Sequence, residues 1–409
     1  MPIWTARGVA EVTRKALVLP GAGARGAYQV GVLKAIATLL PERAANPFSI
    51  ISGTSAGAIN ASVLASRASR FDFAVAEMER VWSNFEAHHV YRADNWTMLR
   101  SSLHWLAAFV FGGLGVRNPV SLLDNQPLRE MLTKNINLQH IERAIERGYI
   151  DALAITASGY SSSRSVTFFQ GAGSLRPWAR VRRIGKPAKI SLDHLMASSA
   201  VPFVFSPVMI GGEYFGDGAM RQRAPLSSAI HLGADRMLVI GVRDEHPDPE
   251  PSEATPAEAP SLGHLAGYML DTLFMDGLYA DLERLTRINL ILEQLDQELS
   301  GPVAPLRPLS TLIIVPKEDL REVAARHVHE LPMAVRLLLR GLGAMNRGGM
   351  QLVSYLLFES GFTRELIEMG YRDAMEVEED LRAFLFDQAM DTLDARLDIK
   401  RDLMHEETD

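Results

Sequence analysis

One serine lies in surroundings that suit a nucleophile. Ser55 lies between two glycines in the segment Gly53-Thr54-Ser55-Ala56-Gly57. The apolar run 48–52 predicts a buried strand before it, and the small-residue stretch 55–66 predicts a helix after it. G-x-S-x-G between a strand and a helix is the nucleophile elbow, whose sharp turn raises the serine oxygen above the sheet. The pattern predicts a nucleophilic serine, and the alternative is a purely structural turn of common small residues.

A glycine-rich loop follows the first predicted strand, 16–20. It comprises Gly21, Ala22, Gly23, Ala24, Arg25 and Gly26. Glycines at the end of a strand let backbone N–H groups point into a cleft, where they can stabilise an oxyanion or bind a phosphate. The sequence therefore predicts an anion-binding loop, and a glycine turn needed only for close packing is the alternative.

The same loop has the G-x-G-x-x-G spacing of a dinucleotide-binding site. That site also requires an acidic residue about 20 residues later, at the end of the second strand, to bind a ribose. The second predicted strand here leads into Ile51-Ser52-Gly53-Thr54-Ser55, and Glu42 precedes that strand. Because the required carboxylate is missing, the sequence favours an oxyanion hole over a nucleotide site.

An aspartate in a glycine turn is the third candidate. Asp217 follows the predicted strand 208–215 and is succeeded by Gly218 and Ala219. A carboxylate at a strand end is well placed to meet a serine on a neighbouring strand and accept its proton. Asp-Gly is also a very common turn dipeptide. Asp217 therefore gains a chemical role only in combination with the two other motifs.

In this order the three motifs resemble those of the patatin-like phospholipases. That family has a G-x-G-x-[RK]-G loop, then G-x-S-x-G, then D-G-[AG], and the segment 197–203 (ASSAVPF) also looks like the family. The resemblance covers about residues 17–242. It implies a catalytic dyad without histidine, in which Ser55 attacks an acyl ester and Asp217 is the general base.

The resemblance also gives the glycine loop a role. The backbone amides around Gly23, Ala24 and Arg25 would form the oxyanion hole, and water would hydrolyse an acyl-enzyme. This chemistry needs no metal and no cofactor. Two positions depart from the family: Ala22, where many members have glycine, and Pro20, where many have an acidic residue. A Cβ at position 22 limits the backbone conformations open to the loop.

A histidine could instead complete a triad in the order serine, aspartate, histidine. The candidates after Asp217 are His231, His246, His264, His327 and His329. His231 lies in the predicted helix 225–232, and His246 lies in an acidic, proline-rich stretch. No glycine-flanked histidine loop follows a late strand, so we expect these histidines to lie apart from the reaction.

Arg25 and the pair His88 and His89 carry weaker hypotheses. Arg25 could orient the glycine loop or bind a lipid phosphate, and a structural salt bridge is an equal alternative. Adjacent histidines on a helix point in different directions, and Glu86 is the one carboxylate close by in sequence. A metal site is therefore not expected there.

The order of predicted elements indicates the fold class. Strand, glycine turn and helix occur twice between residues 16 and 66, which is typical of a parallel α/β sheet. Further strands are predicted at 150–157, 165–169, 208–215 and 237–242. Together with the resemblance, this pattern predicts a three-layer α/β/α sandwich with a mainly parallel central sheet and a helical C-terminal region.

Three regions are expected along the chain. Residues 1–243 would form the catalytic domain. Residues 244–261 are acidic and proline-rich with almost no large apolar side chains, so we expect a linker or surface loop. Residues 262–409 would be mainly helical, with one strand, 311–315, returning to the main sheet.

Composition excludes several classes of protein. The chain has 409 residues, no cysteine and a formal net charge of −7. Disulfides, thiolate metal sites and cysteine nucleophiles are therefore excluded, and no overall basic field favours nucleic acid. The first 15 residues lack the apolar core of a secretory signal, and no stretch reaches the roughly 18 to 20 apolar residues of a membrane span. We expect a cytoplasmic protein, with peripheral membrane contact as an option and the oligomeric state open.

Two apolar segments could contact lipid. Residues 103–116 form either a lid or interfacial segment or, as the favoured alternative, a buried helix over an acyl pocket. Residues 333–358 carry Arg336, Arg340 and Arg347 among many leucines. That pattern suits a basic amphipathic contact or, with more weight, a core helix with a solvated arginine edge.

Three functions are consistent with the motifs to different degrees. A lipid acyl hydrolase of the phospholipase A or lysophospholipase kind, acting on a lipid or another acyl ester, uses all three motifs. An NAD(P)-binding oxidoreductase uses the glycine loop alone and lacks the acidic partner. A non-catalytic lipid-binding scaffold uses none of the chemistry. The sequence favours the acyl hydrolase.

Overall fold

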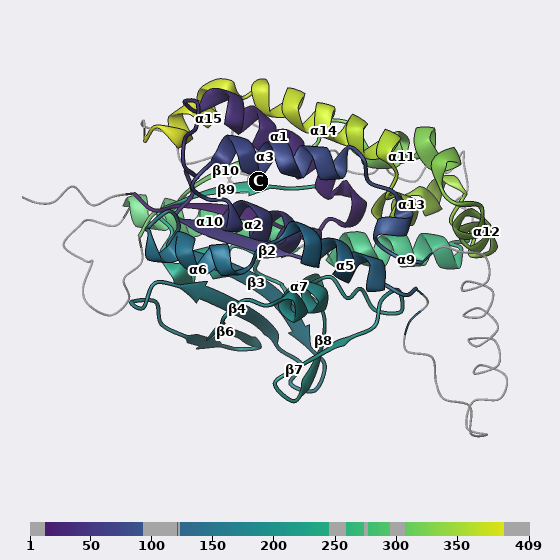
Figure 1. Ribbon diagram of the computed structural model, residues 1–409, viewed down its shortest axis with the longest axis horizontal. Coiled ribbons are helices and arrows are strands. Elements are labelled where there is room, and N and C mark those ends of the chain that lie inside the picture. Colours follow the sequence, from purple (N-terminus) through teal and green to yellow (C-terminus); the bar gives the residue numbers. More distant parts are fainter. Residues whose placement is uncertain are drawn as a thin grey trace, which may run out of the picture.

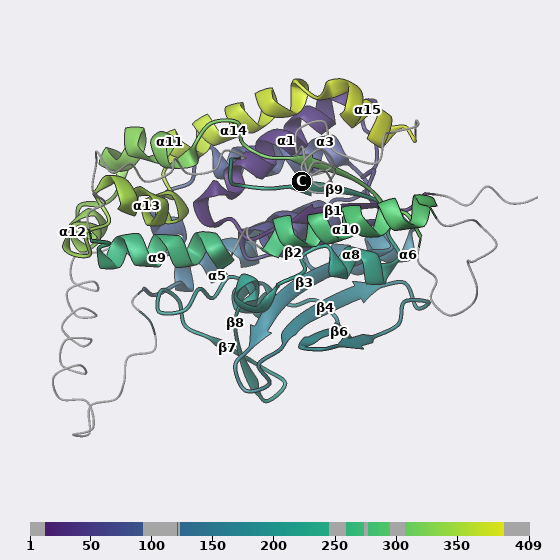
Figure 2. The ribbon, with the colours of Figure 1, turned by 180° about the vertical axis from the view of Figure 1, so that it is seen from behind.

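The computed structural model describes residues 13–92, 121, 123–244, 259–273, 277–294 and 307–387. Its centre is a single mixed sheet with helices on both faces (Figures 1 and 2). The strands that run parallel to one another are β1 (Lys15–Leu19), β2 (Ile50–Thr54), β3 (Ala152–Gly159), β9 (Arg236–Ile240) and β10 (Ser310–Ile314).

The rest of the sheet is attached to β3. Its strands are β4 (Ser165–Gly171), β5 (Trp178–Arg180), β6 (Arg183–Pro187), β7 (Val208–Ile210) and β8 (Glu213–Asp217). The path through the sheet is β10-β9-β1-β2-β3-β4-β6-β5, and the hairpin of β7 and β8 joins it through β8 and β3. Both β4 and β8 run antiparallel to β3. The sheet is therefore parallel in one half and mixed in the other.

Alternation along the strands divides the core into two layers. Leu17 and Leu19 of β1 belong to one buried cluster, whereas Ala16 and Val18 belong to the cluster on the opposite face. Successive side chains of a strand point to opposite faces, so a fully apolar strand serves both layers. The continuous apolar run at 16–19 in the sequence is thus explained by burial on both sides.

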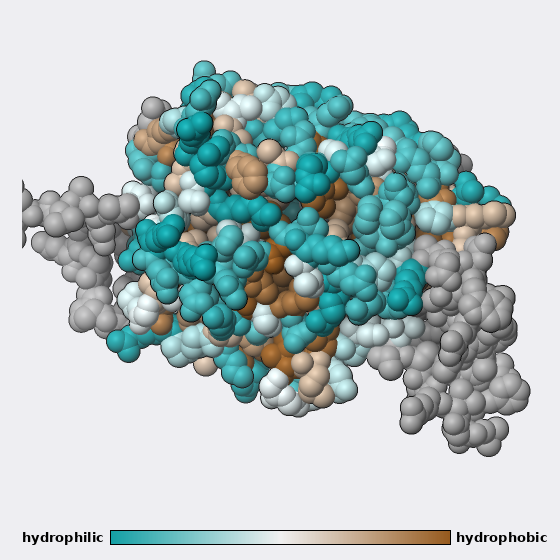
Figure 3. All heavy atoms as spheres, in the orientation of Figure 1, coloured by the Kyte–Doolittle hydropathy of each residue, from teal (hydrophilic) through white to brown (hydrophobic). Residues whose placement is uncertain are grey.

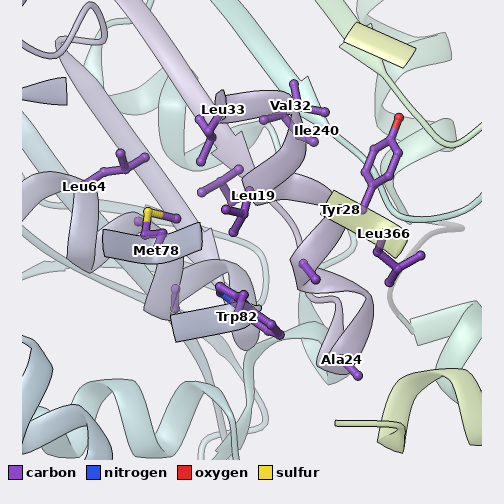
Figure 4. Close-up of a cluster of buried hydrophobic side chains, with 14 of the residues drawn as sticks. Leu19, Ala24, Tyr28, Val32, Leu33, Leu64, Met78, Trp82, Ile240 and Leu366 are labelled. Atoms are coloured by element: carbon purple, nitrogen blue, oxygen red, sulfur yellow. The ribbon is translucent and has the colours of Figure 1, made fainter. Parts of the chain in front are cut away.

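The larger layer contains α1 (Gly26–Leu39), α2 (Ala56–Ser66), α3 (Phe71–Trp82), α5 (Gln126–Asn135), α6 (Gln139–Glu146) and α7 (Leu192–Ser198). Its side chains converge from several elements, including Leu19 of β1, Leu33 of α1 and Met78 of α3 (Figure 4). The opposite layer is built on α8 (Ser227–Leu232) and α10 (Gly277–Gln294). This α/β/α arrangement confirms the predicted fold class.

The C-terminal region is helical and packs on the first half of the chain. Its helices are α9 (Leu262–Asp271), α11 (Leu320–His327), α12 (Met333–Gly341), α13 (Met350–Leu356), α14 (Ser360–Met375) and α15 (Glu378–Leu385). The long helix α14 lies along α1 in both ribbon views (Figures 1 and 2), and the Tyr28 hydroxyl donates to Asp373 Oδ2 at 3.1 Å. The segment expected to return to the sheet, 311–315, corresponds to β10, which pairs with β9.

Several expected elements differ in detail. The single strand expected at 208–215 is wrong, because Gly211 and Gly212 have positive φ angles of 56° and 86° and turn the chain into the β7–β8 hairpin. Strands β5 and β6 were not predicted, because half-exposed polar residues alternate there without a continuous apolar run. Residues 103–116, and most of the acidic stretch 244–261, lie outside the described residues.

Candidate active site

Ser55 occupies the strained turn between β2 and α2. Its φ of 54° and ψ of −127° are a conformation that residues with a Cβ rarely adopt. The turn is tight enough that a Cβ at Gly57 would lie 2.1 Å from the Leu19 carbonyl oxygen of β1. Glycine is therefore required at position 57, which is the physical reason for the final glycine of the motif.

Hydrogen bonds to neighbouring elements hold this turn in place. The Ser55 backbone N–H donates to Ser198 Oγ at 2.9 Å, and the Ser198 hydroxyl donates to the Thr156 carbonyl at 2.7 Å. Thr54, the residue before the serine, donates through Oγ1 to Gln222 Oε1 at 2.6 Å. The start of α2 directly follows Ser55, so the positive end of that helix faces any negative charge on the serine oxygen.

Asp217 is a buried carboxylate, and one of its two oxygens lacks a hydrogen bond of good geometry within the described part of the chain. It is 2% exposed. Its Oδ1 accepts the Ala219 N–H at 2.9 Å, and its Oδ2 accepts no hydrogen bond of good geometry from any described residue. Burial raises the pKa of Asp217 to about 7, and the Ser55 hydroxyl and the Ala219 amide act in the opposite direction. The carboxyl group therefore titrates near neutral pH beside the serine.

The register of β3 explains why these two side chains meet. Parallel pairing of β2 with β3 ends at Thr54 opposite Thr156. On the next residue of β3, antiparallel pairing with β8 begins, with Asp217 opposite Ala157. The residue after Thr54 is Ser55. The ends of β2 and β8 therefore lie beside neighbouring residues of β3, Thr156 and Ala157. Strand β3 thus joins two motifs that are 162 residues apart in sequence (55 to 217).

The glycine loop lies beside the serine. It forms a short 3-10 turn, η1 (Gly23–Arg25), before α1. Ala22 has a negative φ of −145°, so this position does not need the left-handed backbone conformation that favours glycine, and the departure from glycine is accommodated. Gly23 has a positive φ of 53° and lines the same pocket as Ser55. A Cβ at Gly23 would also lie 2.5 Å from the Tyr355 carbonyl oxygen of α13.

Arg25 is held from the C-terminal region. Its guanidinium donates to Ser354 Oγ at 2.9 Å and 2.7 Å and lies 3.4 Å from Asp271 Oδ1. It also lies over the Tyr355 ring at 4.0 Å from the centroid, and the Tyr355 hydroxyl donates to Asp271 at 3.0 Å. Both charged side chains are almost fully buried, at 2% and 4% exposure. Arg25 is therefore a structural cation, which supports the salt-bridge hypothesis and leaves it no access to a lipid phosphate.

An apolar pocket extends from Ser55 along α2. Its walls come from α2, α3 and α5, and the C-terminal region contributes Leu270, Leu356 and Phe358. The apolar wall residues on the three helices include Ile59, Val63, Met78, Val81, Trp82, Leu128, Met131 and Leu132. Figure 3 shows hydrophobic residues in hollows of a face that is otherwise mostly hydrophilic. The pocket contains about 1020 Å³ of space free of atoms, part of it open to solvent.

The far end of the pocket is polar. Ser55 and Arg67 cap opposite ends of α2, which has 11 residues and a length of about 16 Å at 1.5 Å per residue. Arg67 donates to the Asn135 carbonyl at 3.0 Å, and both residues line the pocket with Glu77. The pocket therefore runs from Ser55 along α2 to charged side chains at its other end.

The described histidines lie elsewhere. The His231 ring stacks on Trp178 with the ring centroids 5.0 Å apart, and its Nδ1 hydrogen-bonds to the Ser227 carbonyl oxygen at 2.7 Å. His327 lies between Glu330 and Glu365, at 2.6 Å and 2.5 Å. Neither lines the pocket, and the same is true of His264 and His329. His246 lies outside the described residues.

In the part of the chain that the structure describes, no group of three or more histidine, aspartate or glutamate side chains is placed to bind a metal ion. His88 and His89 were expected to point apart, but they lie on a 3-10 turn and their ring centroids are 4.1 Å apart. Glu86 approaches His88 Nδ1 at 3.0 Å. The expectation for their directions is wrong, because it assumed α-helical spacing and the two histidines lie on a 3-10 turn.

Some residues near the site were not found from the sequence. Asp271, Ser354 and Tyr355 hold Arg25, yet they lie in helices without a recognisable motif. Tyr160 is near Asp217: burial is the main cause that raises the pKa of its hydroxyl, and the charge of Asp217 adds to it. Contacts across such distances in sequence leave no local pattern.

Comparison with known proteins identifies a matching protein family. The sequence model described as Patatin-like phospholipase matches residues 17–230. A search of curated proteins finds no match. Among solved structures, VipD from Legionella pneumophila is 11% identical, with a TM-score of 0.38, 92% of this chain covered and 67% of VipD covered. The type III effector protein ExoU is 14% identical, with a TM-score of 0.29, 87% of this chain covered and 54% of the ExoU chain covered.

Proposed function

Because the chain belongs to the patatin-like phospholipase family, whose model matches residues 17–230, we propose that it hydrolyses fatty-acyl esters through an acyl-enzyme on Ser55. The observation that carries the proposal is the meeting of Ser55 and Asp217 at one point of β3, next to an apolar pocket. A serine, a buried base and a cavity for an acyl chain are the parts that such a reaction needs.

Asp217 is the proposed general base. A base works best when its pKa is close to the working pH, and burial places the pKa of Asp217 at about 7. As Ser55 Oγ attacks the ester carbonyl carbon, its proton passes to the Asp217 carboxylate. The leaving alcohol takes that proton as the C–O bond breaks. In the second step Asp217 takes a proton from water as the water oxygen attacks the acyl carbon of the acyl-enzyme. The bond between Ser55 Oγ and the acyl carbon then breaks, Ser55 Oγ takes the proton from Asp217, and the fatty acid is released.

The glycine loop is the proposed oxyanion hole. Its backbone N–H groups, between Gly21 and Gly26 and centred on Gly23, Ala24 and Arg25, would donate to the carbonyl oxygen as it becomes negative. One such donor contributes about 3 to 4 kcal/mol to the stabilisation of the transition state in other hydrolases. The N-terminus of α2 adds a favourable field at the same position.

The apolar pocket is the proposed acyl site. Its walls are methyl, methylene and aromatic groups around Ile59, Met78 and Leu132. Burying a methylene there releases about 0.8 kcal/mol, so affinity rises with the length of the acyl chain until the chain reaches the polar end at Arg67 and Glu77. The proposed substrates are therefore phospholipids, lysophospholipids or other esters of long acyl chains.

Covalent labelling and product analysis test this function together. Wild-type protein should react with a fluorophosphonate probe and release fatty acid from a panel of lipids, measured by mass spectrometry. Ser55→Ala should abolish labelling and lower hydrolysis by at least about 10³-fold. Ser62→Ala is the matched control, because it removes a buried hydroxyl from the same helix that bonds only locally, to the Ala58 carbonyl.

The two other functions predict different results in the same experiment. A non-catalytic scaffold would show no labelling and no fatty-acid release in the wild type. A dinucleotide enzyme would bind NAD, detected as a thermal shift, and would be insensitive to Ser55→Ala. Full activity of Ser55→Ala would refute the proposal.

A further inference from the structure

Helix α9 has its hydrophobic side chains on the outside. Leu262, Leu265, Tyr268 and Met269 are 69%, 46%, 63% and 60% exposed. The residues that face the protein are Gly263, Gly267 and Asp271. Surface helices normally bury the large apolar residues and expose the polar ones, so the orientation of α9 is the reverse of the usual one.

Close packing fixes this orientation. A Cβ at Gly263 would lie 2.5 Å from the Ala344 Cβ, and a Cβ at Gly267 would lie 2.7 Å from the Leu352 backbone nitrogen. At the end of the helix, Asp271 is buried against Arg25. Rotation of α9 to bury its leucines would bring bulky residues into these narrow contacts and separate a buried ion pair. The outward apolar face is therefore built into the fold.

Helix α12 extends the same surface. It lies near the start of α9 in both ribbon views (Figures 1 and 2), and the Gly263 N–H donates to the Leu342 carbonyl that follows α12, at 2.7 Å. Met333 and Leu337 of α12 are 67% and 54% exposed. Figure 3 also shows hydrophobic residues at the edge of the molecule where Figure 1 places α12. We call the exposed residues Leu262, Leu265, Tyr268, Met269, Met333 and Leu337 the α9–α12 face.

Basic residues border this face, and within the described helices α9 and α12 no exposed carboxylate lies on it. Arg340 is exposed and Arg336 is half-exposed, and both lie on the same side of α12 as Met333 and Leu337. The single carboxylate of α9 is Asp271, which is buried. The chain as a whole has a net charge of −7, so the positive border is a local feature against an acidic background.

We propose that the α9–α12 face docks on an anionic lipid surface. Apolar side chains bordered by arginines are typical of helices that lie in the boundary between headgroups and acyl chains, and exposed apolar side chains gathered on one surface indicate an interaction site. The proposal rests on the proposed function, because α9 also belongs to the pocket: Leu270 lines it, and the next residue, Asp271, holds Arg25 of the glycine loop. Docking on this face brings the pocket to its lipid.

A double substitution on α9 tests the docking surface. Leu265→Glu with Met269→Glu places two charges in the face without touching the pocket. The matched control is Phe73→Glu with Val181→Glu, because these side chains are also exposed and apolar, at 52% and 90%, but lie on other elements. Binding is measured by co-sedimentation with vesicles of phosphatidylcholine and phosphatidylglycerol. The α9 variant should bind at least tenfold more weakly than wild type, and the control should bind like wild type.

Hydrolysis of a soluble short-chain ester separates this proposal from the proposed function. Both double variants should cleave that ester at the wild-type rate. If the wild type cleaves no ester, the proposed function fails, while the vesicle experiment still decides the docking surface. Equal vesicle binding by wild type and the α9 variant would overturn the docking proposal. So would a wild-type dimer in gel filtration that the α9 variant loses while vesicle binding is unchanged, since a second copy would then cover the face.

Discussion

The nucleophile turn at Ser55 and the glycine loop at Gly23 lie side by side, but different parts of the chain support them. The Ser55 turn is enclosed by the first strands and their neighbours, through Leu19, Thr156 and Ser198. The glycine loop is held by α9 and α13, whose Asp271 and Ser354 bind Arg25. The turn is thus a product of the sheet, whereas the loop depends on helices more than 240 residues further along the chain.

This difference has a consequence for function. Damage to the Ser55 turn should remove the reacting groups or the elbow itself, which abolishes the chemistry. Damage to the support of the glycine loop should leave the serine and its base in place and weaken only the stabilisation of the oxyanion. The two kinds of variant should therefore differ in size of effect and in pH dependence.

Removal of the base should have the largest effect. Asp217→Asn keeps the shape of the side chain but cannot accept the serine proton, and general-base catalysis contributes about 10²- to 10⁴-fold. We expect kcat on a lipid ester to fall by that factor. A kcat within threefold of wild type would show that Asp217 is not the base.

The stability of Asp217→Asn provides its folding control. The pKa of Asp217 in the fold, about 7, is raised above the ordinary value, so the native state favours the neutral acid. Ionisation then costs stability progressively as the pH rises from about 4 to 7. The Asn variant escapes that cost, and its Tm relative to wild type should be higher at pH 8 than at pH 4.

A methyl group in the elbow should have the next largest effect. In Gly57→Ala the new Cβ would lie 2.1 Å from the Leu19 carbonyl oxygen, so the turn must shift. A displacement near 1 Å at a catalytic group costs about 10²-fold in rate, and overpacking costs about 1 to 3 kcal/mol of stability. Gly173→Ala is the control, because no atom lies within 4 Å of a Cβ there. Urea unfolding and kcat/KM measure both consequences.

Loosening the support of the glycine loop should have a smaller effect. Asp271→Asn removes the charge that pairs with Arg25 but keeps a hydrogen-bonding side chain of the same size. We expect kcat to fall about tenfold with KM nearly unchanged, which is less than the roughly 10²- to 10³-fold loss when an oxyanion donor is deleted. Asp281→Asn is the control, because Asp281 is also a buried aspartate but bonds to Leu226 of another segment. A parallel rise in KM would indicate general damage to the pocket.

The smallest expected change is in the pH profile. In the wild type, activity should rise with pH and level off above about 7, because only the ionised Asp217 accepts a proton. Asp271→Asn should lower the plateau but leave the midpoint within about 0.3 pH units, since a shift of one unit needs about 1.4 kcal/mol of changed interaction at Asp217. A displaced midpoint would mean that the C-terminal support also sets the environment of the base.

The prediction of strands succeeded where the apolar signal was continuous and failed where it was not. Buried strands such as β1 and β3 contain apolar runs, at 16–19 and 152–155, because both of their faces are covered. The outer strands β5 and β6 carry exposed and polar residues and gave no such signal. The hairpin at Gly211 and Gly212 was mistaken for one strand, since the apolar residues continue on both sides of the turn.

Local sequence was enough to predict the parts of the site that depend on neighbouring residues. A strand, a tight turn of small residues and a helix start are all encoded within a few residues, which is why the G-x-S-x-G motif placed Ser55 in an elbow and the ordered motifs gave the family. The roles of Ser55 and Asp217 stay predictions until they are tested. The turn around Ser55, however, could be anticipated from neighbouring residues.

Contacts between residues distant in sequence became visible in the folded chain alone. The tertiary structure set the register that places Asp217 beside Ser55, the burial that raises the pKa of Asp217, and the ion pair that assigns Arg25 to Asp271. It also turned Leu262 and Leu265 of α9 outward. Each of these is a property of two or more segments packed together. The free energy of packing belongs to the contact, so no single segment can encode it.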